Sequence, residues 1–203
     1  MKTPYFLIHQ SKLKENVQGF FNALNKLWPN SVIAYSVKTN SLPWVLKYLA
    51  SLGVWAEVVS DEEYRLACLC GYSSSNIVFN GPIKGKDIFI EAANNDSIIN
   101  IDSKNDLTYL NSINMHSLQN IGLRINVDPS RFDVNDIGYE NDGFRFGFSD
   151  ESGELYDALL QLKAINGENR IGLHLHCNSV TRSIKVYQSI ARYAAEIIRK
   201  YNV

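Results

Sequence analysis

The chain has 203 residues and a net charge of -1, with 45% hydrophobic and 20% charged residues. This balance is typical of an ordinary soluble globular protein with a sizeable core. Its Lys and Arg residues form no cluster, so we expect neither a nucleic-acid partner nor binding to an anionic membrane. The apolar run near the start is too short for a signal peptide, and no apolar window reaches the length of a membrane span.

The chain has three cysteines, Cys68, Cys70 and Cys177. A small and odd number of cysteines argues against a disulfide framework. Cys68 and Cys70 fall in a helical pattern, where side chains two residues apart diverge, which is a poor arrangement for zinc. We therefore expect free thiols and a reducing, cytoplasmic location.

Short apolar runs alternate with amphipathic segments along the whole chain. The expected strands are Val32–Val37, Val54–Val59, Ile77–Phe79, Ile98–Ile101, Ile121–Val127 and Ile171–His176. The expected helices are Ser11–Leu27 (with Ser11 as N-cap), Leu42–Leu52, Glu62–Leu69, Lys84–Ala93, Lys104–Ile113, Glu151–Ile165 and Ile184–Tyr201. Strands that alternate with helices at roughly 20–25 residue intervals predict parallel βαβ units.

The connections are short except for residues 128–150, which are rich in glycine, aromatic and charged residues. A loop of that length in a compact domain is usually functional, so we expect a lid or wall over a site. No GxGxxG motif follows the first strand, which disfavours a dinucleotide-binding sheet. Polar residues recur at the expected strand ends, where a (β/α)8 barrel carries its chemistry. They are Lys38, Glu57, Asn80, Asp102, Arg124 and His176.

The two-residue period of a strand decides which of these side chains share a face. His174 and His176 point the same way, and Leu173 and Leu175 point the other way, toward the helices. Lys38 shares its face with Ser36. An inward lysine could act as a Schiff-base nucleophile after losing hydration, or it could extend to the barrel rim as a solvated side chain. Strand phase alone leaves both options open.

The stretch YSVKTN, which contains Lys38, resembles the lysine strand of pyridoxal-phosphate enzymes with the alanine-racemase-like barrel. Within these it is most similar to the ornithine/diaminopimelate/arginine decarboxylase group. Further motifs follow in the family's order: AEVVSDEEY, IVFNGPIK, INIDSKNDL, GLRINVDP, RFGF (Arg145–Phe148) and GLHLHCNS. FNGPIK and INIDS are most similar to the diaminopimelate decarboxylase branch.

The resemblance implies a (β/α)8 barrel that binds pyridoxal 5'-phosphate and decarboxylates a basic or diamino amino acid. Lys38 would form the Schiff base with the cofactor, and His176 would stack on its ring. Ser179 would bind the phosphate near the start of the last helix. Glu57 matches an acidic residue close to the lysine, and Arg124 matches a cofactor-side arginine. The resemblance also implies an amino acid as a small-molecule substrate and a homodimer for the full-length form. Asn80 and Asp102 lie within family motifs and are assigned structural roles, and His174 is assigned a packing role.

Two departures from the family pattern stand out. Asn178 replaces a family glycine in the motif that contains Ser179. The chain also ends after about six βα units, where a complete barrel needs eight strands and about 250 residues. We therefore expect residues 11–203 to be a partial barrel, without the C-terminal β-domain. Residues 1–10 would contain a strand, Pro4–His9, that pairs with that absent domain, and the fragment alone would be inactive.

Three alternatives remain from the sequence. The first is a racemase or another pyridoxal-phosphate enzyme on the same barrel, and the second is a non-catalytic relative. The third is a metal-dependent hydrolase built on His174 and His176, although an HxH pair by itself is a weak metal signal.

Overall fold

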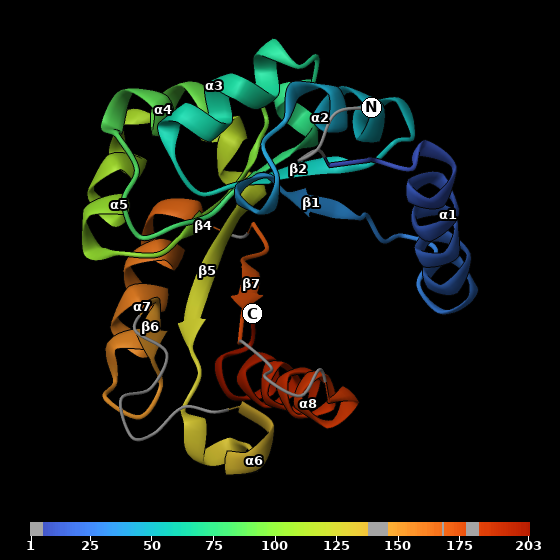
Figure 1. Cartoon of the computed structure of the whole chain (residues 1–203). Coiled ribbons are helices and arrows are strands. Elements are labelled where there is room, and N and C mark those ends of the chain that lie inside the picture. The colour runs from blue at the N-terminus through green and yellow to red at the C-terminus, as the bar shows by residue number, and fades with distance from the viewer. Residues whose placement is uncertain (1–5, 138–145, 168, 178–182) are drawn as a thin grey trace.

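The computed structural model describes residues 6–137, 146–167, 169–177 and 183–203. A curved parallel sheet forms its centre, with helices packed along its outer side (Figure 1). Strand residues line a hollow on the inner side of the sheet. The strands are β1 (Ala34–Ser36), β2 (Trp55–Val58), β3 (Ile77–Phe79), β4 (Ile98–Ile101), β5 (Ile121–Asn126), β6 (Phe148–Ser149) and β7 (Gly172–Leu175). The predicted α/β class is confirmed, and the described strands form part of a barrel wall.

The helices that cover the sheet follow the strands in the alternation expected from the sequence. They are α2 (Pro43–Ser51), α3 (Asp61–Leu69), α4 (Lys86–Asn94), α5 (Lys104–Tyr109), α7 (Glu154–Asn166) and α8 (Ile184–Tyr201), with α1 (Gln10–Leu27) before the first strand. A further short helix, α6 (Val134–Ile137), was not expected. Ser60 and Ser103 cap α3 and α5 by accepting hydrogen bonds from backbone N–H groups in the first turn. These caps explain why both helices begin directly after a strand.

The predicted start of the chain needs two corrections. The first helix begins at Gln10 with His9 as its N-cap, so Ser11 lies inside the helix and does not cap it. The described part of the predicted N-terminal strand, Phe6–His9, forms no strand, and Pro4 lies outside the described residues. A strand needs a neighbour to satisfy its backbone groups, and no described segment offers one here.

Five strands are paired in sequence order, from β1 to β5, and all pairs are parallel. Ile125 of β5 pairs with both Phe148 of β6 and Leu175 of β7, so β6 and β7 lie on opposite sides of β5. The short strand β6 continues on the β4 side, beyond the end of β4. Among the described residues, β1 and β7 each keep one unpaired edge, so the barrel wall is open between them.

The segment predicted as one long loop, residues 128–150, contains more structure than expected. It holds a 3-10 turn at Pro129–Arg131, helix α6 and the two-residue strand β6. A two-residue strand is too short to produce a periodic pattern, which is why the sequence did not reveal it. Residues 138–145 lie outside the described part, and so does Arg145 of the RFGF motif.

Side-chain alternation divides each strand between the core and the hollow. The main core lies between sheet and helices and includes Phe79, Ile99, Ile101, Leu123 and Ile125, all at most 1% exposed. A smaller cluster forms where half-buried Leu13, Val17 and Phe21 of α1 pack against Val45, Leu49 and Val54. The apolar residues of each strand face outward into this core, so the alternate residues of the same strand face inward and line the hollow.

Candidate active site

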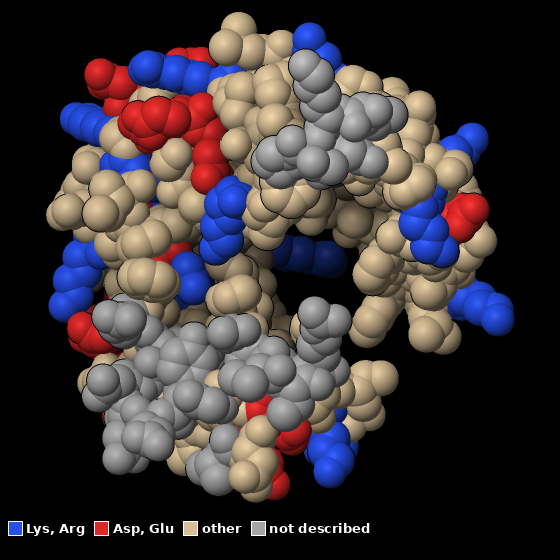
Figure 2. Space-filling view, in the orientation of Figure 1, with Lys and Arg blue, Asp and Glu red and all other residues tan. Residues whose placement is uncertain are grey.

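A pocket of about 470 Å³ occupies the inner side of the sheet, and space-filling atoms show the hollow with basic side chains on its wall (Figure 2). That volume lies within the range of ordinary small-molecule sites. Its lining residues come from β1, β2, β3, β4, β5 and β7 and the turns after them. They are Ala34, Ser36, Lys38, Glu57, Val59, Val78, Asn80, Asn100, Arg124, Leu173, His174, Leu175 and His176.

Four of the five site residues predicted from the sequence meet in this pocket: Lys38, Glu57, Arg124 and His176. The fifth, Ser179, lies outside the described residues, as does Asn178. The pairing predicted for His174 and His176 is confirmed, because both line the pocket. Ser36 and Lys38 also line it together, although Lys38 lies beyond the end of β1. Leu173 and Leu175 pack on the core as expected, and they also border the pocket.

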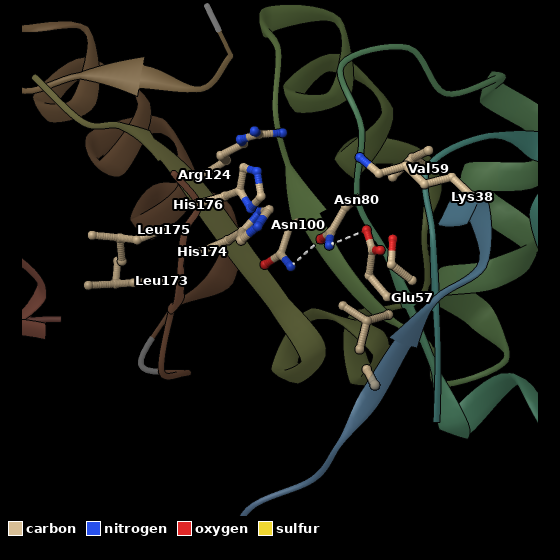
Figure 3. A pocket seen from close by; sticks show the side chains of 13 residues that line it. Lys38, Glu57, Val59, Asn80, Asn100, Arg124, Leu173, His174, Leu175 and His176 are labelled. Carbon is tan, nitrogen blue, oxygen red and sulfur yellow. Dashed lines mark hydrogen bonds between the residues drawn. The ribbon is translucent and has the colours of Figure 1, made fainter. Parts of the chain in front are cut away.

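The sequence pattern predicted a strand that ends at Lys38, and this prediction is wrong. β1 stops at Ser36, and Val37–Thr39 form one 3-10 turn, with Val37 buried and Lys38 exposed. The turn carries the amine across the mouth of the pocket toward the wall that holds Arg124 and His176 (Figure 3). The amine is thus open to a ligand rather than enclosed by protein.

A buried ion pair with Asp102 holds the guanidinium of Arg124 in place. Its guanidinium donates to Asp102 Oδ2 at 2.9 Å, and the ring of Phe146 lies 5.1 Å from the guanidinium carbon. A second buried ion pair lies next to the first, with Lys84 Nζ 2.8 Å from Asp106 Oδ2. The two pairs are connected because the backbone N–H of Asp102 donates to the same Asp106 oxygen. These contacts fix a positive charge on the pocket wall.

The surroundings of His176 favour its neutral form. Loss of hydration lowers its pKa, the positive charges of Arg124 and Lys38 lower it further, and the carboxylate of Glu57 opposes them. A neutral imidazole on the pocket wall offers a flat face to a ring-shaped ligand without adding positive charge. Burial also raises the pKa of Cys177 to about 11, so the neighbouring thiol stays protonated at neutral pH and is a poor nucleophile.

Two polar atoms of the pocket-lining residues are buried and lack a hydrogen-bond partner within the described structure: Ser36 Oγ and His174 Nδ1. Burial, together with Arg124, His176 and Lys84, lowers the pKa of His174 to about 3. The described residues contain no group of three or more His, Cys, Asp or Glu side chains placed to hold a metal ion. No helix in the described part of the chain is both long and apolar enough to span a membrane.

Asn100 is a site residue that the sequence reasoning missed. It lies in the middle of β4 between Ile99 and Ile101, and it donates to Asn80 Oδ1 at 2.6 Å. Asn80 in turn donates to Glu57 Oε1 at 2.9 Å. A polar residue at an inward position of an apolar strand was the available signal, because such a residue needs a buried partner.

Comparison with known proteins decides the family. The family described as "Pyridoxal-dependent decarboxylase, pyridoxal binding domain" matches residues 12–202. The chain belongs to this family. The residues in the pocket fit the cofactor that the family name implies: an accessible amine, a fixed positive charge and a neutral imidazole line one cavity of suitable size.

Individual relatives agree with this family. The diaminopimelate decarboxylase of Methanocaldococcus jannaschii is 28% identical over 206 residues, covering 97% of this chain and 46% of the relative. The probable chloroplastic diaminopimelate decarboxylase of Oryza sativa subsp. japonica is 29% identical over 195 residues, covering 94% of this chain and 39% of the relative. The chain therefore spans less than half the length of these two curated relatives.

Solved structures show the same fold. The crystal structure of the M. jannaschii diaminopimelate decarboxylase in complex with L-lysine aligns with a TM-score of 0.70 at 24% identity, over 95% of this chain and 46% of that one. The arginine decarboxylase of Paramecium bursaria Chlorella virus aligns with a TM-score of 0.68 at 23% identity, over 92% of this chain and 48% of that one. The predicted barrel fold is thus confirmed, and the described strands correspond to the N-terminal portion of that barrel.

Proposed function

We propose that this chain is the cofactor-binding part of a pyridoxal-phosphate-dependent decarboxylase that acts on a basic or diamino amino acid, of the diaminopimelate, ornithine, lysine or arginine type. The observation that carries the proposal is the accessible Lys38 amine, which faces Arg124 and His176 across one pocket. A decarboxylase of this kind needs an amine that can bind an aldehyde, and Lys38 is the lysine among the pocket-lining residues.

Each pocket residue has a proposed role toward the cofactor. Lys38 binds its aldehyde carbon covalently, and His176 packs its neutral ring on the ring of the cofactor. Arg124, fixed by Asp102, supplies a positive charge beside the ring, and Glu57 balances the charge of the lysine. Ser179 binds the phosphate in this proposal.

The bound cofactor supplies an electron sink for the pair left at Cα when the α-carboxylate departs. The chain's own residues orient the group that departs and control protons around it. Lys38 would hold the cofactor through its aldehyde carbon, and the ammonium form of the same side chain, at the pocket mouth, would be placed to donate a proton to Cα. Neutral His176 covers one face of the ring and limits the access of water to it.

Substrate, assembly and location are also proposals. Curated relatives from plants, archaea and bacteria are named diaminopimelate decarboxylase or probable diaminopimelate decarboxylase, which favours a diamino acid as substrate. We infer a homodimer for the full-length enzyme. Three free thiols, at Cys68, Cys70 and Cys177, favour a reducing, cytoplasmic location.

The experiment that tests the proposal is cofactor binding to the purified chain. Pyridoxal phosphate added to the protein should produce a visible absorbance band that dialysis does not remove. The variant Lys38→Ala should lack the band, whereas Lys47→Ala, which removes a lysine that does not line the pocket, should keep it. An unchanged band in Lys38→Ala, or no band in the wild-type protein, would contradict the proposal.

A further inference from the structure

Three polar side chains from adjacent strands form a row of hydrogen bonds across the pocket wall (Figure 3). Asn100 Nδ2 on β4 donates to Asn80 Oδ1 after β3 at 2.6 Å, and Asn80 Nδ2 donates to Glu57 Oε1 on β2 at 2.9 Å. Asn80 and Asn100 are 6% and 7% exposed, so neither amide can exchange its partner freely for water. We call these three residues the amide row.

The carboxylate at the end of the row fixes the direction of every bond in it. An ionised carboxylate only accepts hydrogen bonds, so Asn80 must turn its NH2 group toward Glu57. The amide oxygen of Asn80 then faces Asn100, which must also donate. Each amide therefore has one allowed orientation, with its NH2 group directed along the row toward Glu57.

The neighbouring strand leaves room for the far end of the row. Gly122 of β5 pairs in register with Asn100, and a Cβ on Gly122 would overlap the amide oxygen of Asn100. The glycine is required here by the space that the Asn100 side chain occupies. Four strands, β2 to β5, thus contribute one residue each to the placement of one carboxylate.

The Glu57 carboxylate is the negative group near His176, and its charge raises the pKa of His176. The size of this effect depends on where the carboxylate lies. The charged groups around His176 are Arg124 from β5, Lys38 from the 3-10 turn after β1, and Glu57 from β2. Arg124 has its own buried anchor, whereas in the described part of the chain the side chain of Glu57 is held by the hydrogen bond from Asn80. Loss of the row would release the carboxylate toward solvent.

We propose that Asn80 and Asn100 are positioning residues that hold the ionised Glu57 carboxylate in the pocket, facing His176 and Lys38. Neither amide needs to touch a ligand for this role. The importance of Glu57 for the cofactor rests on the proposed function above, whereas the hold of the row on Glu57 does not. The row acts at a distance, because Asn100 influences Glu57 only through Asn80.

The test is the pKa of His176 in the cofactor-free chain, measured by NMR titration of histidine ring protons and assigned with His176→Gln. Glu57→Gln should lower this pKa, because the opposing negative charge is removed. Asn80→Leu should lower it toward the Glu57→Gln value, and Asn100→Leu should lower it by a smaller amount. Both substitutions are neutral, so they add no charge of their own to the pocket.

The decisive comparison repeats both substitutions in the Glu57→Gln background, where they should cause no further shift. Val78→Ala, which alters the pocket wall in register with Glu57 but outside the row, should leave the pKa of His176 unchanged. Gly122→Ala is a smaller perturbation of Asn100 and should act like Asn100→Leu if that variant folds poorly.

An unchanged or raised pKa in Asn80→Leu, or an equal shift with and without the Glu57 carboxylate, would overturn the inference. Because the readout needs no cofactor, the two proposals can fail separately. A chain that binds no pyridoxal phosphate but shows these shifts would refute the proposed function and keep the amide row. The binding of pyridoxal phosphate with no such shifts would do the reverse.

Discussion

His174 makes the protein's stability depend on pH in a way that can be calculated from its surroundings. Its pKa is lowered from 6.5 to about 3 by burial and by the nearby charges of Arg124, His176 and Lys84. Between these two values the unfolded chain binds a proton at this position and the folded chain does not. The folded state therefore has its full stability above pH 6.5 and loses it progressively as the pH falls toward 3.

The size of the effect follows from about 1.4 kcal/mol for each pH unit over which only the unfolded state is protonated. Lowering the pH from 7 to 5 should cost about 2 kcal/mol through His174 alone. In His174→Gln this contribution is absent, so the free energy of unfolding should fall by about 2 kcal/mol less over the same interval. His116→Gln is the matched control for loss of an exposed histidine.

The assay is urea unfolding at several pH values, followed by circular dichroism for wild type and both variants. Subtracting the curve of His174→Gln from that of the wild type cancels the carboxylates that titrate in the same range. Parallel curves for the two proteins between pH 7 and 5 would refute the assignment of His174 as a neutral, partly buried group.

Three further predictions concern residues outside the row. Lys84→Met should reduce the free energy of unfolding in urea by about 3–5 kcal/mol, because it leaves a buried carboxylate unpaired; a loss below about 1 kcal/mol would contradict this. Burial raises the pKa of Asp150, but the hydrogen bonds from Lys200 and Tyr201 and the charges of Lys200 and Arg131 together outweigh it and lower this pKa below 3.8. The contribution of Asp150 to stability is therefore present at neutral pH and lost in acid, so Asp150→Asn should flatten the acid limb of a stability–pH curve, and an unchanged limb would argue against it. Gly147→Ala should reduce the free energy of unfolding in urea more than Gly153→Ala does. Both glycines have a positive φ, 88° and 83°, but only a Cβ at Gly147 would meet the β5 backbone, at 2.6 Å. Equal losses of unfolding free energy in the two variants would refute the contact.

Much of the pocket could be predicted from strand alternation. Once the apolar face of β7 is directed at the helices, His174 and His176 must face the hollow, and the structure has them there. Ser36 and Lys38 also line the hollow, but Lys38 reaches it from the 3-10 turn after β1, which strand alternation does not describe. The roles of Glu57 and Arg124 could not be derived in the same way. A polar residue near a strand end has several ordinary explanations, and only the order of the motifs separated them.

Other features depend on contacts between distant parts of the chain. In the sequence Asn100 is one polar residue in an apolar strand, and its role depends on the hydrogen bond to Asn80. The requirement for glycine at position 122 likewise depends on the Asn100 side chain, which occupies the space of a Cβ there. The strand β6 exists because two residues fit beside the end of β5, beyond β4, and no local pattern records that fit. Such features follow from tertiary packing, which overrides local sequence preference.

The measurement that tests the central claim most directly is the site of covalent attachment of the cofactor. The chain is incubated with pyridoxal phosphate, reduced with borohydride, digested and analysed by mass spectrometry. The account predicts a phosphopyridoxyl group on Lys38 at one equivalent per chain, lost in Lys38→Ala without labelling elsewhere. Labelling spread over surface lysines, with Lys38 unmodified, would contradict it.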